Sequence, residues 1–172
     1  YWSEVSIETT SLKKSIDDAT WVPCNSGGSF RRWYGNNERI VLWKNQGSLM
    51  KQYRNKSGKI ASAIRNEEYY FQPGLTWTKN SAGRFAVRWM AEGFAFDDTG
   101  RSGFVKNGDF ARQKLMAVLN SAFVEKALEI LAPDMSVTSK QLARVPIPTI
   151  KEDVTSLVDE AVTIAKTDWD AF

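Results

Sequence analysis

The spacing of apolar residues changes near residue 110, and this change limits the folds open to the chain. Before it, short runs alternate apolar and polar side chains, as where Phe85, Val87 and Trp89 are interleaved with polar residues. A period of two is typical of half-buried strands, and a period near 3.6 is typical of helices. After residue 110 the apolar residues recur at helical spacing: Leu115, Val118, Leu119, Ala122, Phe123, Ala127, Leu128 and Leu131. We therefore expect an α+β fold, with a mixed, mostly antiparallel β-sheet followed by C-terminal helices.

Alternating, β-branched and aromatic runs bounded by turn residues predict the strands of the first 110 residues. Strands are expected at 1–8, 20–24, 38–44, 68–72, 76–78, 84–90, 93–97 and 104–105, with short helices at 11–18 and 48–54. The runs 84–90 and 93–97 are expected to form a hairpin that turns at 91–93. In helix 48–54, we expect Leu49, Met50 and Tyr53 to point inward.

The helical part is predicted to contain three segments. Asn120 and Ser121 are both good capping residues, so they divide the run 111–131 into two helices, and Pro133 ends the second. Residues 145–148 (VPIP) form a stiff, extended connector. Thr149 and Glu152 have the spacing of a capping box that opens a last helix. The apolar stripe of that helix consists of Val154, Leu157, Val158, Ala161 and Ala165.

Positive charge is concentrated in residues 31–65. This stretch holds nine Lys and Arg residues against Glu38 alone, a net charge of +8, whereas the whole chain of 172 residues carries +3. A basic block inside a folded domain is expected where a protein binds a phosphate backbone. The alternatives are a solvated basic surface and a protein-interaction module that docks an acidic partner.

Aromatic residues follow the same distribution. Of 21 aromatic residues, 15 lie between Phe30 and Phe110. Exposed rings among basic residues stack on unpaired bases, so a single-strand RNA or DNA binder is a further alternative. The strand-like alternation around Val87 favours packing in the core for most of these rings.

The residues for several kinds of catalysis are missing. The chain has no histidine and one cysteine, Cys24, which excludes Ser-His-Asp sites, Cys-His sites, histidine metal sites and an internal disulfide. Such cysteine usage favours a reducing, cytoplasmic compartment. Neither of the phosphate-binding glycine patterns occurs, nor does an Asn/Asp-Pro-Pro-aromatic loop that holds a flipped base. No apolar run approaches the roughly 20 residues that span a bilayer, so we expect no membrane partner.

Two carboxylate pairs are candidate sites for acid–base or magnesium chemistry. They are Glu67 with Glu68 and Asp97 with Asp98. Adjacent residues of a strand point to opposite faces, so neither pair converges easily. We therefore expect no metal site, no cofactor and no catalysis in this chain itself.

Several motifs resemble one protein family. The run 21–38 (WVPCNSGGSFRRWYGNNE) closely resembles a motif of the PglX-type adenine methyltransferases of BREX phage-defence systems, and 65–71 (RNEEYYF) with 74–77 (GLTW) resembles the next family block. Residues 119–121 (LNS) and 144–148 (RVPIP) are similar to the end of a target recognition domain, as in type I specificity subunits and fused restriction–methylation enzymes. Residues 169–172 (WDAF) resemble the start of a further motif.

The resemblance implies a division of labour. It implies a parent enzyme that is an S-adenosylmethionine-dependent N6-adenine DNA methyltransferase, with its cofactor and catalytic motifs outside this chain. Residues 1–148 would be the target recognition domain, and 149–172 a spacer helix that docks the methyltransferase half. The implied partners are double-stranded DNA, that N-terminal half and other defence-system subunits. The specificity domain of a fused type II restriction–modification enzyme is the nearest alternative.

These patterns suggest roles for individual residues. We expect phosphate contacts from the basic block: Lys44, Lys51, Arg54, Lys56, Lys59 and Arg65. Base edges are read by long polar side chains on loops, and the candidates are Lys79, Asn80, Arg84, Arg101 and Lys106. Motif residues shared by relatives that read different sequences are expected to be structural: Gly27, Gly28, Phe30, Arg32, Trp33, Tyr34, Gly35 and Asn36.

Overall fold

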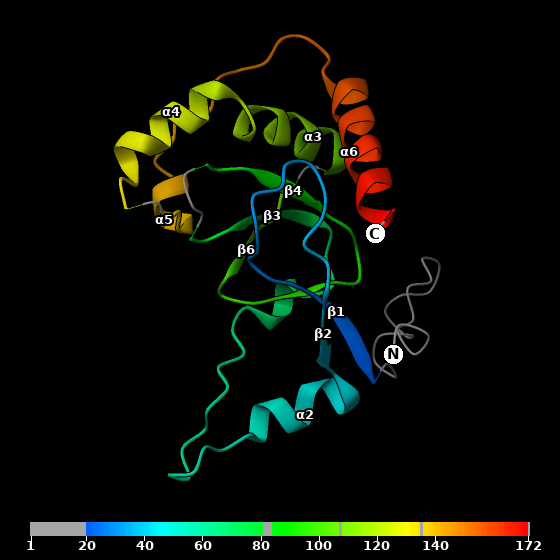
Figure 1. Ribbon diagram of the computed structural model, residues 1–172, viewed down its shortest axis with the longest axis vertical. Helices are drawn as coiled ribbons and strands as arrows, with labels where there is room; N and C mark the ends of the chain where they lie inside the picture. The colour runs from blue at the N-terminus through cyan, green and yellow to red at the C-terminus, as the bar shows by residue number, and fades with distance from the viewer. Residues whose placement is uncertain (1–19, 81–83, 107, 135, 172) are drawn as a thin grey trace.

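A computed structural model describes residues 20–80, 84–106, 108–134 and 136–171 (Figure 1). In chain order the elements are β1 (Trp21–Asn25), β2 (Arg39–Leu42), α2 (Lys44–Gln52), the 3-10 helix η2 (Glu67–Tyr69), β3 (Gly74–Thr78), β4 (Val87–Met90), β5 (Ala95–Phe96), β6 (Gly100–Gly103), α3 (Gly108–Leu119), α4 (Ala122–Leu131), α5 (Ser139–Leu142) and α6 (Thr155–Asp170). The strand predicted for 1–8 and the helix predicted for 11–18 lie outside the described residues.

Two small sheets make up the β region. In the first, β1 pairs antiparallel with β2 and parallel with β5. In the second, β3 lies between β4 and β6 and is antiparallel to both. The expected α+β class is confirmed, because the strand pairs are mixed and mostly antiparallel and the helices α3 to α6 follow them.

The main core lies between the second sheet and helices α3, α4 and α6, which cover one of its faces (Figure 1). Its buried members include Leu75, Trp77, Val87, Met116, Val124, Leu128 and Val158. Complete burial of such an apolar side chain stabilises the fold by about 1.5–3 kcal/mol. Successive residues of a strand point to opposite faces, so the register partners Thr76 and Arg88 lie on the other side of this sheet.

A smaller core joins the first sheet to α2. It consists of Val22, Cys24, Trp43 and Ala95. The Trp43 ring lies 5.4 Å from the rings of both Tyr70 and Phe71, measured between centroids. Many of the rings in the aromatic-rich stretch are therefore used in packing rather than offered to bases.

Asn120 ties the helices to β4. Its buried side chain accepts a hydrogen bond from the backbone N–H of Val87 at 2.8 Å and donates one to the Val87 carbonyl at 3.0 Å. Ser121 caps α4 by accepting a hydrogen bond from the backbone N–H of Val124 at 3.4 Å. The predicted division of the run 111–131 at Asn120 and Ser121 is confirmed.

The hairpin predicted for 84–90 and 93–97 is wrong, because β4 and β5 belong to different sheets. Phe71 explains the difference. Its backbone N–H donates to the carbonyl of Phe94 at 2.9 Å, and its carbonyl accepts from the N–H of Gly93 at 3.0 Å. These bonds lead the chain away from β4 and toward β1. Apolar alternation reports which face of a strand is buried, not which strand lies beside it.

Two other predicted strands are misplaced. In the stretch 68–72 the chain forms η2 instead, after Asn66 adopts a left-handed φ of 56°. The last strand is β6 at Gly100–Gly103 rather than 104–105. Phe104 stacks on the ring of Tyr69 at 5.1 Å, so its β-like sequence context reflects ring packing.

Helix α6 begins at Thr155, so the capping box predicted at Thr149 and Glu152 is wrong. Asp153 is the residue that orders the first turn, because its carboxylate accepts hydrogen bonds from the backbone N–H and the hydroxyl of Thr155 at 3.0 and 2.6 Å. The extended connector continues past Thr149 to the start of α6.

The apolar stripe of α6 faces the core only in part. Val158 is buried in the main core and Val162 packs against it, whereas Leu157 is 65% exposed. Across the described ranges, the helices lack the length and apolarity needed to cross a membrane.

Candidate nucleic-acid interface

Residues 44–65, called the basic arm below, carry all six predicted phosphate contacts. The arm comprises α2 and the long loop after it, and Figure 1 shows that it extends away from the sheets on the side opposite α3 and α4. Lys44, Lys51, Arg54, Lys56, Lys59 and Arg65 are all exposed. Among the described residues, only Lys51 of these six forms an ion pair, with Glu67 at 2.7 Å.

The tip of the arm is a small hairpin organised by Asn55. Its side-chain oxygen accepts from the backbone N–H groups of Ser57 and Lys59 at 3.0 and 3.1 Å. The guanidinium of Arg54 donates to the carbonyl of Gly58 at 2.8 Å. Asn commonly forms such local turns with its own backbone. The tip therefore presents the cations of Lys56 and Lys59 from an ordered turn.

The root of the arm is anchored through few side chains. Met50 and Ile64 pack against the smaller core, and the hydroxyl of Ser62 donates to the carbonyl of Met50. Leu49 and Tyr53 are 62% and 61% exposed, so the prediction that they point inward is wrong. Residues 45–47 have left-handed backbone angles, so regular helix starts only at Ser48.

A cavity of about 630 Å³ opens beside the root of the arm. Arg65 and Asn66 line it from the arm side, and Arg101 and Ser102 line it from β6. Asp98 lies on the same wall. The structure thus brings one predicted phosphate contact, Arg65, together with one predicted base reader, Arg101.

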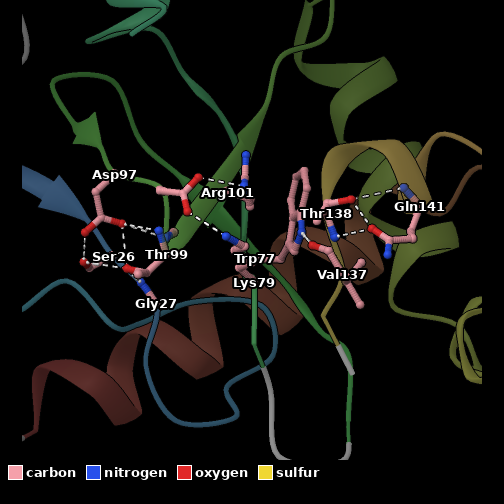
Figure 2. Close-up of polar contacts among 12 residues, drawn as sticks. Ser26, Gly27, Trp77, Lys79, Asp97, Thr99, Arg101, Val137, Thr138 and Gln141 are labelled. Atoms are coloured by element: carbon pink, nitrogen blue, oxygen red, sulfur yellow. Dashed lines mark hydrogen bonds and ion pairs between the residues drawn. The ribbon is translucent and has the colours of Figure 1, made fainter. Parts of the chain in front are cut away.

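Two predicted base readers meet at a single carboxylate. Lys79 and Arg101 each form an ion pair with Asp98 at 2.7 Å (Figure 2). The hydrogen bond from Lys79, together with the charge of Arg101, holds the pKa of Asp98 below its usual range. Arg101 lies in β6 rather than in the loop where sequence analysis placed it.

Asp97 has a different environment from Asp98. Its carboxylate accepts hydrogen bonds from the hydroxyls of Ser26 and Thr99 and from the backbone N–H of Gly100 (Figure 2). Burial alone raises the pKa of Asp97, but these hydrogen bonds outweigh burial and lower the pKa. Asp97 therefore joins β1 to β6. Within the described ranges, no group of three or more Asp, Glu or Cys side chains could hold a metal ion.

The remaining base-reading candidates do not join this cluster. Arg84 donates to Glu125 of α4 at 3.0 Å and lies over the Phe30 ring at 4.8 Å. That hydrogen bond, with the charges of Arg84 and Arg32, lowers the pKa of Glu125. Asn80 and Lys106 are exposed on loops. Ser81 and Asn107, which lie in the same loops, are outside the described residues.

The motif loop 26–38 contacts several elements. The backbone N–H of Trp33 donates to Val87 at 3.1 Å, and the N–H of Trp89 donates to Trp33 at 2.7 Å, so the loop adds a bridge to the edge of β4. A Cβ atom at Gly28 would lie 2.7 Å from the amide nitrogen of Asn36. Glycine at this position permits the loop to close on itself.

Other motif residues meet α6 and α4. Gly35 has a φ of 115°, and a side chain there would collide with Arg31 and Trp169. Lys166 lies 5.6 Å from the centre of the Tyr34 ring. Arg32 forms an ion pair with Glu125 at 3.8 Å. These contacts support a structural role for the motif, which stays a prediction for each residue.

Sequence analysis missed Arg88. This residue was interpreted as a polar position of a half-buried strand, yet it is 1% exposed. Burial lowers its pKa to about 10, so the guanidinium is still charged at neutral pH. Its strand position next to Val87 carried no signal of burial, because the loop 26–38 that covers it comes from 50 or more residues earlier in the chain.

Comparisons with known proteins connect this chain to a family. The chain is 33% identical over 174 residues, 99% of its own length, to the adenine-specific methyltransferase BrxX of Escherichia coli O9:H4 (strain HS). It is also 33% identical over 177 residues to the adenine-specific methyltransferase PglX of Lacticaseibacillus casei (strain Zhang). The chain matches a segment of PglX-type methyltransferases. The resemblance drawn from its motifs is therefore confirmed, and no protein-family model matches.

The chain spans 14% and 15% of the length of these two relatives. Atoms of Thr99 and Asn36 lie within 2.9 Å of where a Cβ would be at Gly27 and Gly28, so the protein's own atoms fill the space beside these two motif glycines.

Proposed function

We propose that this chain is the DNA target recognition module of an adenine-specific methyltransferase in BREX phage defence. The chain would grip a DNA duplex and select its sequence, and methyl transfer would belong to another part of a longer, S-adenosylmethionine-dependent protein. The similarity to two adenine-specific methyltransferases supports such a parent enzyme.

The basic arm carries the proposal. Six exposed cations lie on one segment that extends from the domain, and Lys51 alone among them has a carboxylate partner in the described part of the chain. Unpaired surface cations gain most from phosphate groups, because each contact releases a condensed counterion from DNA. The exposed side chains of Tyr53 and Ile60, which are 61% and 57% exposed, lie on the same arm. Apolar residues of this kind can lie against sugars or base steps in a groove.

We assign base reading to the Asp98 cluster, which consists of Asp98, Lys79 and Arg101 at the root of the arm. Arg and Lys bind guanine O6 and N7, and Arg does so with two hydrogen bonds. In the free chain Asp98 holds both Lys79 and Arg101 in place. Exposed ion pairs are worth little, about 0–1 kcal/mol, so a guanine edge can replace the carboxylate as the partner of Arg101.

Helix α6 is proposed as the docking element. Leu157 and Ile164 are 65% and 63% exposed. They are seven residues apart in one helix and therefore share a face. We assign residues 1–148 to DNA recognition and 149–172 to contact with the methyltransferase half or other defence subunits. A bare apolar face on a helix suits such a contact.

Fluorescence anisotropy on labelled DNA tests the proposal. The chain is titrated with duplex and with single-stranded DNA over a salt series. Lys56→Gln with Lys59→Gln removes two charges from the arm tip. The matched control is Arg144→Gln with Lys151→Gln, two exposed cations of the connector between α5 and α6, which runs at the other end of the domain (Figure 1).

Duplex binding should fall steeply with salt in the wild type and in the control. In the arm variant, the slope of log affinity against log salt should be smaller by about two, since each phosphate contact contributes about 0.9. Equal slopes in the arm variant and the control would overturn the assignment of the arm. Stronger binding to single strands would favour a stacking surface instead.

A further inference from the structure

Arg88 is a buried guanidinium with unmet hydrogen-bonding capacity. One of its nitrogens, Nη1, donates to the hydroxyl of Thr78 at 3.3 Å. Within the described part of the chain, its Nε and Nη2 atoms have no partner although both are shielded from solvent. A buried charge without a counter-charge destabilises a fold strongly, so such a group is expected to have an anionic partner.

A second buried arginine, Arg112, also has two nitrogens, Nε and Nη1, without a hydrogen-bond partner in the described part of the chain, but its charge is balanced. Arg112 is 5% exposed, and its Nη2 pairs with Asp109 at 2.6 Å. Its guanidinium also lies 3.6 Å from the centre of the Trp89 ring. Arg88 has neither an ion pair nor a ring contact among the described residues.

A small cavity adjoins Arg88. Its volume is about 10 Å³, room for one water-sized atom. Arg88 and Thr78 line it together with Ala86, and Phe30, Arg31 and Arg84 complete its wall. The side chains of Arg31 and Arg84 are 31% and 56% exposed, so they form the rim, and Arg88 forms the floor.

The rim is built from residues that are held in place. Arg31 pairs with Asp168 of α6 at 3.1 Å and lies 4.7 Å from the centre of the Trp169 ring. Arg84 pairs with Glu125 and packs on Phe30. The rim arginines are thus fixed by carboxylates that lie behind them. Arg88 adds a positive charge that no carboxylate in the described residues balances within ion-pair distance, and the charge of Glu38 acts on it from farther away.

We propose that this cavity is a phosphoryl-oxygen site, in which one anionic oxygen of a phosphate enters between Thr78 and Arg88 while the rim arginines contact the other oxygens. The cavity suits this ligand because a phosphate presents single oxygens that accept several N–H groups. The DNA backbone is the source that the proposed function supplies, and in that respect the inference rests on it. Free phosphate has the same chemistry and is the second source.

Two measurements test the site. The first is thermal unfolding of the chain in sodium phosphate against sodium chloride at equal ionic strength and pH 7, which needs no variant. The second is anisotropy on a DNA duplex over a salt series. Both are repeated for Arg88→Met, for Arg88→Lys and for the matched control Arg112→Met.

Phosphate at about ten times its dissociation constant should raise the wild-type Tm by roughly 3–5 °C over chloride. Arg88→Met should lose this rise, Arg112→Met should keep it, and Arg88→Lys should keep part of it. If the DNA backbone is the source, Arg88→Met also lowers the duplex salt slope by about one. An unchanged slope with a lost phosphate effect assigns the site to free phosphate.

The site is overturned if Arg88→Met keeps the phosphate effect on Tm, or if the wild type gains nothing from phosphate over chloride and Arg88→Met binds duplex with the wild-type slope. This outcome is separate from failure of the proposed function. That failure appears as a lack of duplex binding or as an arm variant whose salt slope equals that of its control, and neither result changes the phosphate effect on unfolding.

Discussion

Replacing Asn120 should reveal how the helices hold β4 in register. In Asn120→Ala, the backbone N–H of Val87 loses its partner at 2.8 Å in a buried environment, which costs about 1–3 kcal/mol. The carbonyl of Val87 still accepts a hydrogen bond from the N–H of Trp33 at 3.1 Å. Loss of the bond from the Asn120 amide to this carbonyl therefore costs only about 0.5–1.5 kcal/mol. The free energy of unfolding should therefore fall by about 2–4 kcal/mol, equivalent to roughly 5–12 °C in Tm.

Asn120→Asp tests the two hydrogen bonds separately. A carboxylate still accepts from the N–H of Val87, but it repels the Val87 carbonyl, so burial and repulsion raise its pKa in the folded state. A raised folded pKa gives stability that is present below the unfolded value of about 3.9 and is lost as pH rises through the folded value. The deficit of Asn120→Asp relative to wild type should therefore shrink between pH 7 and pH 4.5.

Chemical denaturation monitored by tryptophan fluorescence measures both variants. Asn80→Ala is the control, since this side chain is exposed and should change stability by less than about 0.5 kcal/mol. If Asn120→Ala unfolds within 0.5 kcal/mol of Asn80→Ala, the two bonds to Val87 do not stabilise the fold, and the register of β4 depends on apolar packing alone.

Two further predictions concern the junction of β1 with β5 and β6. The pKa of Asp97 is lowered in the folded state, so its stabilisation is present above about pH 4 and is lost as pH falls through the folded value. Asp97→Asn should thus be less stable at pH 7 and lose less on acidification, which a pH series of Tm values checks. Burial raises the pKa of the Cys24 thiol to about 12, so iodoacetamide at pH 8 should modify native chain far more slowly than urea-unfolded chain.

The parts of the fold that depend on local pattern could be predicted. The strands near Trp21, Ile40 and Thr76 and the division at Ser121 follow from alternation and capping, and the structure has them. The pairing of β5 with β1 and the burial of Arg88 depend on segments distant in sequence. Phe71 redirects the chain through backbone bonds that any residue type can make, so no side-chain pattern announces them.

The candidate site likewise has parts that the sequence predicts and parts that it does not. The basic block at 31–65 could be predicted from charge alone, and the structure places six of its nine cations on one exposed arm. The contact of Lys79 and Arg101 with Asp98 could not be predicted from the sequence, because it requires β3 and β6 to be neighbours. A count of charges along the sequence predicts a basic surface, whereas the ion-pair partner of each cation depends on the order of the strands in the sheet.

Under the proposed function, the motif loop 26–38 would give modules that read different DNA sequences a common frame. Its backbone bonds to β4 through Trp33, and its Gly27 N–H donates to Thr99 beside β6 at 3.0 Å. Its Arg31 reaches Asp168 of α6. These bonds join the second sheet to α6, and Phe30 and Arg31 of the loop form part of the wall of the Arg88 cavity. The arm tip and the Asp98 cluster lie outside this loop, so substitutions there can change DNA contacts while the loop keeps the fold and its proposed phosphate site intact.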